Sequence, residues 1–503
     1  MKAANRSAIH FAIRRRMASA FILLLALCSG ARALWAQDDL TTQNGSSALN
    51  GGWITGPASN PLSLLNGPAY RTFGKTAPYD FPDFHPISSL DRRLPRWLAF
   101  ELEERLRFEG YQNGNFQPDN DDLYLLNRLR LQADLRPNRW MRFSAQAQDA
   151  RPINQKPPYG PPNENRWDLK LAYAEFGNPE KHRISVRVGR QLINYNNTII
   201  ASSEWRNQGR SYDAVVTNLQ QGRFHLGVFA ASAVVPLASG ISHHQEGNNI
   251  YGVYGRFSSV IPKSDFEPFV LWHVQPRVIL DPAISNTRGK QNLRAYGFRL
   301  KGQPRSAFEY SAEGVFENGT QGNEPLRAWA TSDGIAYRKE SWLGQPRIFT
   351  QLDYASGSAV PSAGVHHTFD AIYSTSHDRF GITDILGWQN IQAFRVGGTV
   401  SPHLRWTMTA QFLDFGIAQQ NDALYNNSGQ PVGHGNPIYG KHIGDEADVY
   451  SWYEINRHLN LGAGYGHLAA GEFLQHLTGM PSYSNFYIAI NFKDNGQGGA
   501  QKQ

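Results

Sequence analysis

The feature that most constrains this chain is a two-residue alternation of apolar and polar side chains that recurs along most of its length. In "LRLQADLRPNRWMRFSAQAQ" (residues 129–148), Leu, Ala, Met and Phe alternate with Arg, Gln, Asp and Ser on both sides of a Pro-Asn turn. "AFEYSAEGVFE" (307–317) and "LRWTMTAQF" (404–412) alternate in the same way. This period is that of a β-strand whose two faces meet different surroundings. The pattern therefore predicts a β-protein in which one face is unusually rich in arginine and amide side chains.

The connections between the candidate strands indicate how those strands close. Residues 96–492 contain about 18 candidate strands. Tight turns follow most even-numbered strands, whereas most long connections follow odd-numbered ones, such as 192–209, 357–385, 416–443 and 469–483. The connections after the eleventh and twelfth strands depart from this rule. Such sorting of loops is typical of outer-membrane β-barrels, in which hydrocarbon leaves no place for an open sheet edge.

We therefore expect an all-β fold, a transmembrane antiparallel up-and-down β-barrel with long extracellular loops and short periplasmic turns. At this strand number side chains no longer fill the interior, so an aqueous lumen follows. A lipid-facing Arg at the bilayer midplane costs roughly 2–4 kcal/mol, so the arginines must point inward. The expected inner-face cations are Arg105, Arg107, Arg128, Arg130, Arg142, Arg187, Arg347 and Arg405, and Glu101, Glu103, Asp134, Glu309, Glu313 and Asp353 lie among them.

For any one of these arginines, a salt bridge within the barrel wall is the alternative to a role in binding. Aromatic residues near strand ends are expected to form girdles at the two membrane interfaces, with ordinary packing as the alternative for each. These residues are Trp140, Trp167, Tyr173, Trp272, Trp406, Trp452 and Tyr487.

The regions that flank the barrel differ from it in composition. Residues 1–36 read as a signal peptide, with a basic start, a short apolar core and small-residue cleavage sites. Residues 37–95 form an extension rich in Gly, Ser, Asn and Pro, expected either to plug the lumen or to contact periplasmic export or uptake components. The barrel domain covers residues 96–492, and residues 493–503 form a polar tail.

Charge and cysteine content exclude several classes of partner and chemistry. The chain has 49 basic and 42 acidic residues, and its net charge is +7. Six of the basic residues and none of the acidic ones lie in the predicted signal peptide, so the expected mature chain is close to neutral. A nucleic-acid partner is therefore not expected. The single cysteine, Cys28, also lies in the signal, which excludes disulfides from the mature chain.

Two regions resemble the alginate export family of outer-membrane barrels. The first is "GRQLINYNNTIIASSEWRNQGRSYDAV" (189–215). The second lies within residues 369–492 and includes "FDAIYSTSHDRFGITDILGWQNI", "DALYNNSG", "HIGDEADVY", "GYGHLAAGEFL" and "SNFYIAINF". Taken together and in this order, these motifs are fairly specific. One departure is that relatives often continue the first motif with Tyr-Gly and then Arg, where this chain has Tyr195-Asn196 and Ile199.

The resemblance implies a channel in the outer membrane of a Gram-negative bacterium that conducts an anionic polysaccharide of the alginate type. Conduction needs sites that are favourable enough to enter and shallow enough to leave, which suits arginines interspersed with acids. In addition to the eight inner-face arginines, the family pattern implies substrate contacts at the external mouth. These residues are Arg190, Trp205, Arg206, Arg210 and Asp213, at or near the mouth, with Asp384, Trp388 and Asn390 opposite the start of another strand.

Three functions stay open at this point: polysaccharide export, uptake of other anionic solutes or oligosaccharides by a porin, and a barrel with an enzymatic or adhesive role. No nucleophile elbow, phosphate-binding loop or zincin helix is present. The histidine pairs 243–244 and 366–367 and His377-Asp378 have no third ligand at a fixed spacing. We therefore expect no catalytic residue, no cofactor and no metal; the expected partners are the lipid bilayer and the solute.

Overall fold

The computed structural model describes residues 84–156, 163–177, 183–195, 199–259, 261–280, 287–305, 307–360 and 364–495. The predicted signal peptide, most of the predicted extension and most of the predicted tail lie outside these residues. The strands are β1 (Leu98–Gln112), β2 (Asp122–Asn138), β3 (Met141–Ile153), β4 (Asn165–Phe176), β5 (Ile184–Gln191), β6 (Tyr212–Gln221), β7 (Phe224–Val235), β8 (His243–Ser258), β9 (Ser264–Ile279), β10 (Arg288–Arg305), β11 (Phe308–Gln321), β12 (Glu324–Arg338), β13 (Arg347–Ala355), β14 (Ile391–His403), β15 (Trp406–Ile417), β16 (Leu424–Tyr425), β17 (Pro431–Gly433), β18 (His442–Glu454), β19 (Leu459–Ala470) and β20 (Ser482–Asn495).

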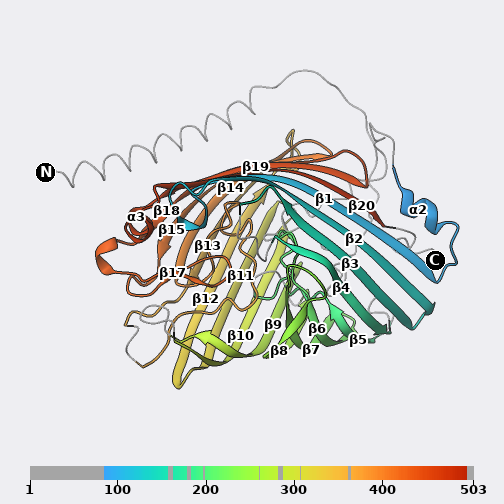
Figure 1. The fold of residues 1–503 in the computed structure, drawn as a ribbon, viewed down its shortest axis with the longest axis horizontal. Helices are drawn as coiled ribbons and strands as arrows, with labels where there is room; N and C mark the ends of the chain where they lie inside the picture. Colours follow the sequence, from blue (N-terminus) through green and yellow to red (C-terminus); the bar gives the residue numbers. More distant parts are fainter. Residues whose placement is uncertain are drawn as a thin grey trace. The chain divides into compact units, whose positions relative to one another are not determined.

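All strands except β16 and β17 belong to one 18-stranded antiparallel sheet that closes on itself (Figure 1). Each strand pairs with the next along the chain, and β1 pairs with β20 from Glu101↔Asn495 to Gln112↔Ser484. The predicted barrel of about 18 strands is therefore confirmed. β20 also continues through Asn495, past the predicted barrel boundary at Phe492.

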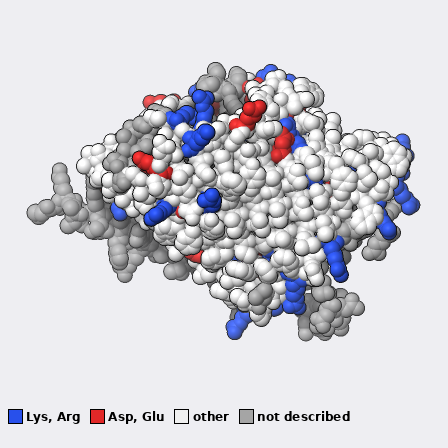
Figure 2. Space-filling model, turned by 90° about the horizontal axis from the view of Figure 1, so that it is seen from below, with Lys and Arg blue, Asp and Glu red and all other residues white. Residues whose placement is uncertain are grey.

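The two faces of the sheet carry the side chains that the alternation predicts. On β2, Arg128 and Arg130 are buried inside the barrel, whereas Leu131 is 49 % exposed on the outside. On β3, Phe143 is exposed and its neighbour Ser144 is buried. Figure 2 shows a broad stretch of the outer surface that few Lys, Arg, Asp or Glu side chains reach. Among the described residues, no helix is long and apolar enough to span a bilayer.

The predicted aromatic girdles are only partly correct. Trp140, Trp167, Trp272 and Trp406 are exposed on the outer side, as expected. Tyr173, Trp452 and Tyr487 are instead buried inside the barrel. On β20, for example, Tyr487 alternates with outward-facing Ile488, so its position in the strand directs it inward.

The connections differ in length between the two ends of the barrel. Turns such as residues 139–140 and 222–223 form the short-turn end, where α2 (Pro86–Asp91) packs against β1 and β20. The loop end carries three long connections: L3 (192–211) between β5 and β6, L7 (356–390) between β13 and β14, and L8 (418–441) between β15 and β18. Shorter elements at the loop end are η1 (Gly114–Phe116), η2 (Pro437–Tyr439) in L8, and α3 (Glu472–Thr478) between β19 and β20.

Candidate functional site

L7 folds into the barrel and contacts its inner wall on several sides. Tyr373 Oη lies 3.2 Å from His273 Nε2 of β9, and the amide of Asp370 donates to Glu317 Oε2 of β11 (3.0 Å). Farther along L7, the amide of Thr383 donates to Glu446 Oε1 of β18 (3.0 Å). Because L7 contacts strands that lie far apart around the barrel, it crosses the barrel interior.

Gly381 lets L7 approach β18 closely. Its φ is +81°, which L side chains rarely adopt, and an added Cβ would lie 1.9 Å from Glu446 Oε1. The backbone conformation at this position therefore favours glycine, and any side chain here would displace the Glu446 carboxylate that holds L7.

L3 covers the opposite part of the inner wall, where a cluster of cations holds it. We call Arg105, Arg128, Arg130 and Lys170, together with the wall carboxylate Glu103, the basic nest. They lie on β1, β2 and β4, and all four cationic side chains are buried. Arg130 Nη1 contacts Glu204 Oε2 of L3 at 2.5 Å, and Lys170 Nζ lies 3.8 Å from its Oε1.

Backbone carbonyls of L3 complete the contact with the nest. Arg105 donates to the carbonyls of Glu204 (2.8 Å) and Arg206 (3.0 Å), and Arg128 donates to that of Glu204 (3.1 Å). Burial alone would raise the pKa of Glu204, but the surrounding Arg130, Lys170 and Arg128 hold it below its ordinary value. Glu204 therefore stays ionised where it sits.

Trp205 lies next to the basic nest, where its ring is sandwiched between a side chain of the wall and a side chain of L7. The Arg107 guanidinium lies 4.1 Å from the indole centroid on one side, and the His377 ring stacks at 3.9 Å and 8° on the other. Burial lowers the pKa of His377, and the positive charges of Arg107 and Arg105 lower it further. The neutral imidazole thus joins L7 to L3 through this stack.

Four other predicted lumen arginines are held within the wall. Arg142 forms a bidentate pair with Asp134 at 2.9–3.0 Å, and Arg187 pairs with Glu175 at 2.6 Å. Arg347 pairs with Glu309 at 2.8 Å. Arg405 lies in the β14–β15 turn at the short-turn end, where it donates to the carbonyl of Ile455 (3.4 Å). Arg142, Arg187 and Arg347 therefore form salt bridges within the barrel wall, which is the alternative to a role in binding.

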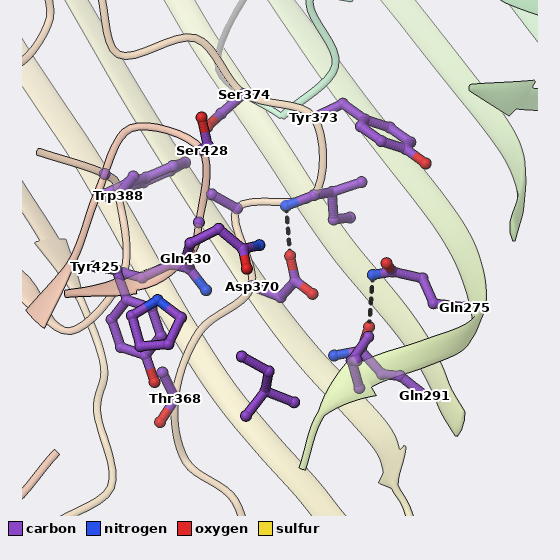
Figure 3. Close-up of a pocket in the computed structure, with 18 of the residues that line it drawn as sticks. Gln275, Gln291, Thr368, Asp370, Tyr373, Ser374, Trp388, Tyr425, Ser428 and Gln430 are labelled. Atoms are coloured by element: carbon purple, nitrogen blue, oxygen red, sulfur yellow. Dashed lines mark hydrogen bonds between the residues drawn. The ribbon is translucent and has the colours of Figure 1, made fainter. Parts of the chain in front are cut away.

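A cavity of about 280 Å³ opens at the loop end between L3, L7, L8 and the ends of β9–β11 (Figure 3). Its arginines are Arg206 and Arg210 of L3 and the exposed Arg277 and Arg288 of the wall. Asp370 and Asp422 also line it, so arginines outnumber acids. The cavity therefore favours an anionic ligand.

The rest of the cavity lining combines amides, hydroxyls and aromatic rings. Gln275 donates to Gln291 (3.0 Å), which donates to Gln321 (3.1 Å), so these side chains form a ladder across β9, β10 and β11. Tyr373 and Trp388 contribute aromatic surface (Figure 3). Planar amides, aromatic faces and arginines are the groups that hydrogen-bond hydroxyls, pack on apolar ring faces and pair with carboxylates.

A buried ion pair packs against the face of Trp388. The Arg379 guanidinium of L7 lies 3.6 Å from the centroid of the indole, and its Nη2 contacts Asp353 Oδ1 of β13 at 2.6 Å. Both charged side chains are only 1 % exposed. The ion pair thus fixes one wall of the cavity to the barrel.

Arg206 and Arg210 reach the cavity from L3, as the resemblance implied for the mouth. Arg206 donates to Ser428 Oγ of L8 (3.1 Å), and Arg210 donates to the carbonyl of Tyr373 of L7 (2.6 Å). Burial lowers the pKa of Arg206 to about 10, and the neighbouring Arg210 adds to the effect. The Arg206 guanidinium therefore still carries its charge at neutral pH.

Two predicted L7 residues have mainly structural contacts. Asn390 is fully buried and links L7 to L8 through the backbone of Gln419 and Ala423 at 2.8–3.0 Å. Asp384 lies 4.0 Å from His377 Nδ1, and its carbonyl accepts from Asn427 of L8. Burial raises the pKa of Asp384 to about 6, although Arg206 and Asn427 oppose the shift.

Arg190 and Asp213 lie on the rim of the barrel and not in the lumen. They pair directly across β5 and β6 at 2.8 Å, and His244 Nδ1 lies 2.9 Å from the same aspartate. Asp213 follows Tyr212, which is buried inside, and shares its face with the exposed Val215. The two residues therefore face outward at the loop end.

The sequence alone did not single out Glu204, the glutamine ladder, Arg277 or Arg288. A signal for part of this set exists: His273 and Gln275 are spaced two apart near the end of one strand and so share its inner face.

One group of potential metal ligands occurs among the residues that were described. Ligand atoms of Asp414, His442 and Asp445 lie within 4.8 Å of one another at the loop ends of β15 and β18. The three side chains are half-buried. Such groups are common without an ion, and this one lies apart from the cavity lining, so it does not define a metal centre.

A closed barrel of this size, with an apolar outer surface, a polar interior and inward-folded loops, is a channel of the Gram-negative outer membrane. The chain belongs to the alginate export family, whose model matches residues 96–488. No curated protein resembles the chain closely enough to count as a match.

Solved outer-membrane structures share the fold at low sequence identity. OccAB2 of Acinetobacter baumannii is 11 % identical with a TM-score of 0.55, and the match covers 79 % of this chain and 98 % of that one. OccK11 (OpdR) of Pseudomonas aeruginosa is 9 % identical with a TM-score of 0.53 over 79 % and 96 %. OccD3 (OpdP) of the same organism gives 9 % and 0.53 over 80 % and 92 %.

Proposed function

We propose that this channel carries an anionic polysaccharide of the alginate type through its interior. The observation that supports the proposal most strongly is the cavity at the loop end, where four arginines, a ladder of amides and the aromatic rings of Tyr373, Trp388 and Tyr425 converge. Carboxylates along a polyuronate would pair with the arginines. The two acids in the same lining would keep each contact weak enough for the chain to move on.

A second candidate is passage of shorter acidic saccharides, in the direction of uptake. It is favoured by the size of the cavity, about 280 Å³, which lies below the roughly 300–1,000 Å³ that enclose drug-sized ligands. Such a space admits one or two sugar rings while L3 and L7 stay in place. Both candidates are transport functions, and neither assigns catalytic chemistry to the barrel.

The extension at residues 37–95 is proposed to meet periplasmic export or uptake components. Its described end, α2, packs at the short-turn end, where Asp494 of β20 accepts hydrogen bonds from the amides of Ile87 (2.7 Å) and Ser88 (3.2 Å). In outer-membrane barrels the short turns face the periplasm. The extension therefore joins the barrel on the side where such components operate.

Block of single-channel current in planar bilayers tests the choice of solute. We expect polyuronate to block the wild-type current and dextran, a neutral polymer, to leave it unchanged. Replacing the two exposed cavity arginines, Arg277→Ala with Arg288→Ala, should raise the half-blocking concentration about tenfold or more, because each lost charge pair contributes about 1 kcal/mol or more.

A matched control is Arg139→Ala, which removes an exposed arginine at the short-turn end. This variant should keep the wild-type half-blocking concentration. Equal block by dextran and polyuronate, or equal effects of the two arginine changes, would contradict the proposal. Oligouronates of increasing length then separate the two candidates, since the second predicts that block stops improving beyond about two units.

A further inference from the structure

L3 separates two basic regions that would otherwise be continuous. The carbonyl of Arg206 accepts from Arg105 of the basic nest (3.0 Å), whereas the guanidinium of the same residue lines the cavity. The nest therefore lies on one side of L3 and the cavity on the other. A solute that passes from one to the other must displace this loop.

The nest contains more positive charge than its own carboxylates neutralise. Three arginines surround two carboxylates, Glu103 from the wall and Glu204 from L3, and Lys170 lies 3.8 Å from Glu204. The side chains of Arg128, Arg130 and Lys170 are at most 5 % exposed, and Arg105 is 7 % exposed. A buried excess of cations without a full set of counter-charges is costly, which indicates a site built to receive an anion.

The contact between Glu204 and the nest also leaves hydrogen-bonding groups unused. Glu204 Oε1 is buried and accepts no hydrogen bond from any described residue. Arg105 Nε and Arg128 Nε are likewise buried donors that have no acceptor among the residues described. A carboxylate that enters with a different orientation could accept hydrogen bonds from the two Nε–H groups, so Glu204 fills the nest incompletely.

We infer that the basic nest is a carboxylate-binding site for the uronate units of the conducted saccharide, and that Glu204 occupies it as an internal substitute. This inference rests on the proposed function. When a uronate carboxylate takes the place of the Glu204 carboxylate, the ionic contact that holds L3 against β1 and β2 is lost. The loss of this contact weakens the attachment of L3 and favours its withdrawal, which would join the cavity to the nest along the wall.

Glu204→Gln tests the inference because it removes the internal carboxylate and nearly preserves its shape. In planar bilayers without any saccharide, we expect this variant to be open for a larger fraction of time than wild type. D-glucuronate should block it at a concentration at least about tenfold lower, because the site is no longer occupied by its own ligand. Glucose should block neither protein.

Glu103→Gln is the matched control. It adds the same charge to the nest, but Glu103 belongs to β1 and holds no loop. Its open fraction should equal or fall below that of wild type, since the nest then attracts Glu204 more strongly. An unchanged open fraction in Glu204→Gln, or an equal rise in Glu103→Gln, would overturn the inference.

Two further measurements keep the test decisive. The shift in mobility between heated and unheated samples on a detergent gel reports whether each barrel has folded. If Glu204→Gln does not fold, Glu204→Asp keeps the charge but shortens its reach, and a rise in open fraction is again expected. If polyuronate blocks wild type while Glu204→Gln and Glu204→Asp behave like wild type, the inference fails and the proposed function stands.

Discussion

The arginines inside this barrel differ in what accepts their hydrogen bonds, and that difference sets their roles. Arg142 and Arg187 meet carboxylates of neighbouring wall strands and so stabilise the wall. Arg105 instead meets two carbonyls of L3. A guanidinium offers five donors in a fixed geometry, which allows one wall residue to hold an irregular loop segment at several points. At the residue level, wall arginines thus determine where L3 lies.

Asp384 gives the docking of L7 a pH dependence. Burial raises its pKa from 3.8 to about 6, with Arg206, Asn427 and Arg107 opposing the shift and Glu109 adding to it. An acid with a higher pKa in the docked loop than in the released loop binds its proton more tightly when docked. Docking therefore weakens as pH rises from about 4 to about 6.

We expect the open fraction in planar bilayers to be larger at pH 7 than at pH 5. Asp384→Asn should abolish most of this difference, while Asp445→Asn, on the outer side of β18, should retain it. The neutral His377 beside Asp384 does not interfere, because burial and two arginines hold its pKa well below its usual range. An open fraction that falls with rising pH, or an unchanged profile in Asp384→Asn, would contradict this account.

At the level of elements, the strands could be predicted from sequence and the loops could not. Strands such as β2 and β3 repeat a two-residue pattern because every second side chain meets lipid, so local sequence carries the signal. The position of L3 depends on contacts between Glu204 and residues about 75 to 100 positions away, such as Arg130 and Arg105. No local pattern encodes such contacts.

The same reasoning explains which residues of the candidate site can be predicted from the sequence. Motif resemblance identified Arg206 and Arg210, which do line the cavity. It also included Arg190 and Asp213, which pair on the outward side of the rim, because a motif does not record which face a residue occupies. Tyr487 was assigned to a girdle although its alternation with Ile488 already placed it on the inner face.

L7 should depend on the ion pair between Arg379 and Asp353. Asp353→Asn leaves the guanidinium buried without its counter-charge, and breaking a buried pair in this way costs about 3–5 kcal/mol. The hydrogen-bonded ladders of β13 persist, so the cost falls on the docking of L7. We expect trypsin to cleave the folded Asp353→Asn barrel after Arg379 and to spare that bond in wild type.

The control is Asp149→Asn, which removes a carboxylate from a pair with the more exposed Arg151. It should leave the bond after Arg379 protected. Equal resistance of wild type and Asp353→Asn to trypsin at this position would mean that the ion pair does not hold L7 in place.

At the level of the whole molecule, the barrel separates lipid from a polar interior. Leu131 lies near the middle of β2 and is 49 % exposed on the outside, while the next residue, Gln132, points inward and accepts from Gln146 (2.9 Å). Leu131→Arg should lower the free energy of unfolding in lipid vesicles by roughly 2–4 kcal/mol. Gln132→Arg should lower it by less, since the added charge meets the polar interior instead of lipid.

Urea titration of the vesicle-inserted protein measures both values. Equal losses in the two variants would mean that the two faces of the strand meet similar surroundings. This result would contradict the assignment of the outer face to lipid and of the inner face to a polar interior.

The most direct test of the central claim is the reversal potential of single channels in a tenfold KCl gradient. The claim is that a closed barrel directs its basic side chains inward, along the path of an anionic saccharide. It predicts a reversal potential of the sign for chloride preference, together with a current that polyuronate blocks. A reversal potential of the sign for potassium preference, with a current indifferent to polyuronate, would contradict it.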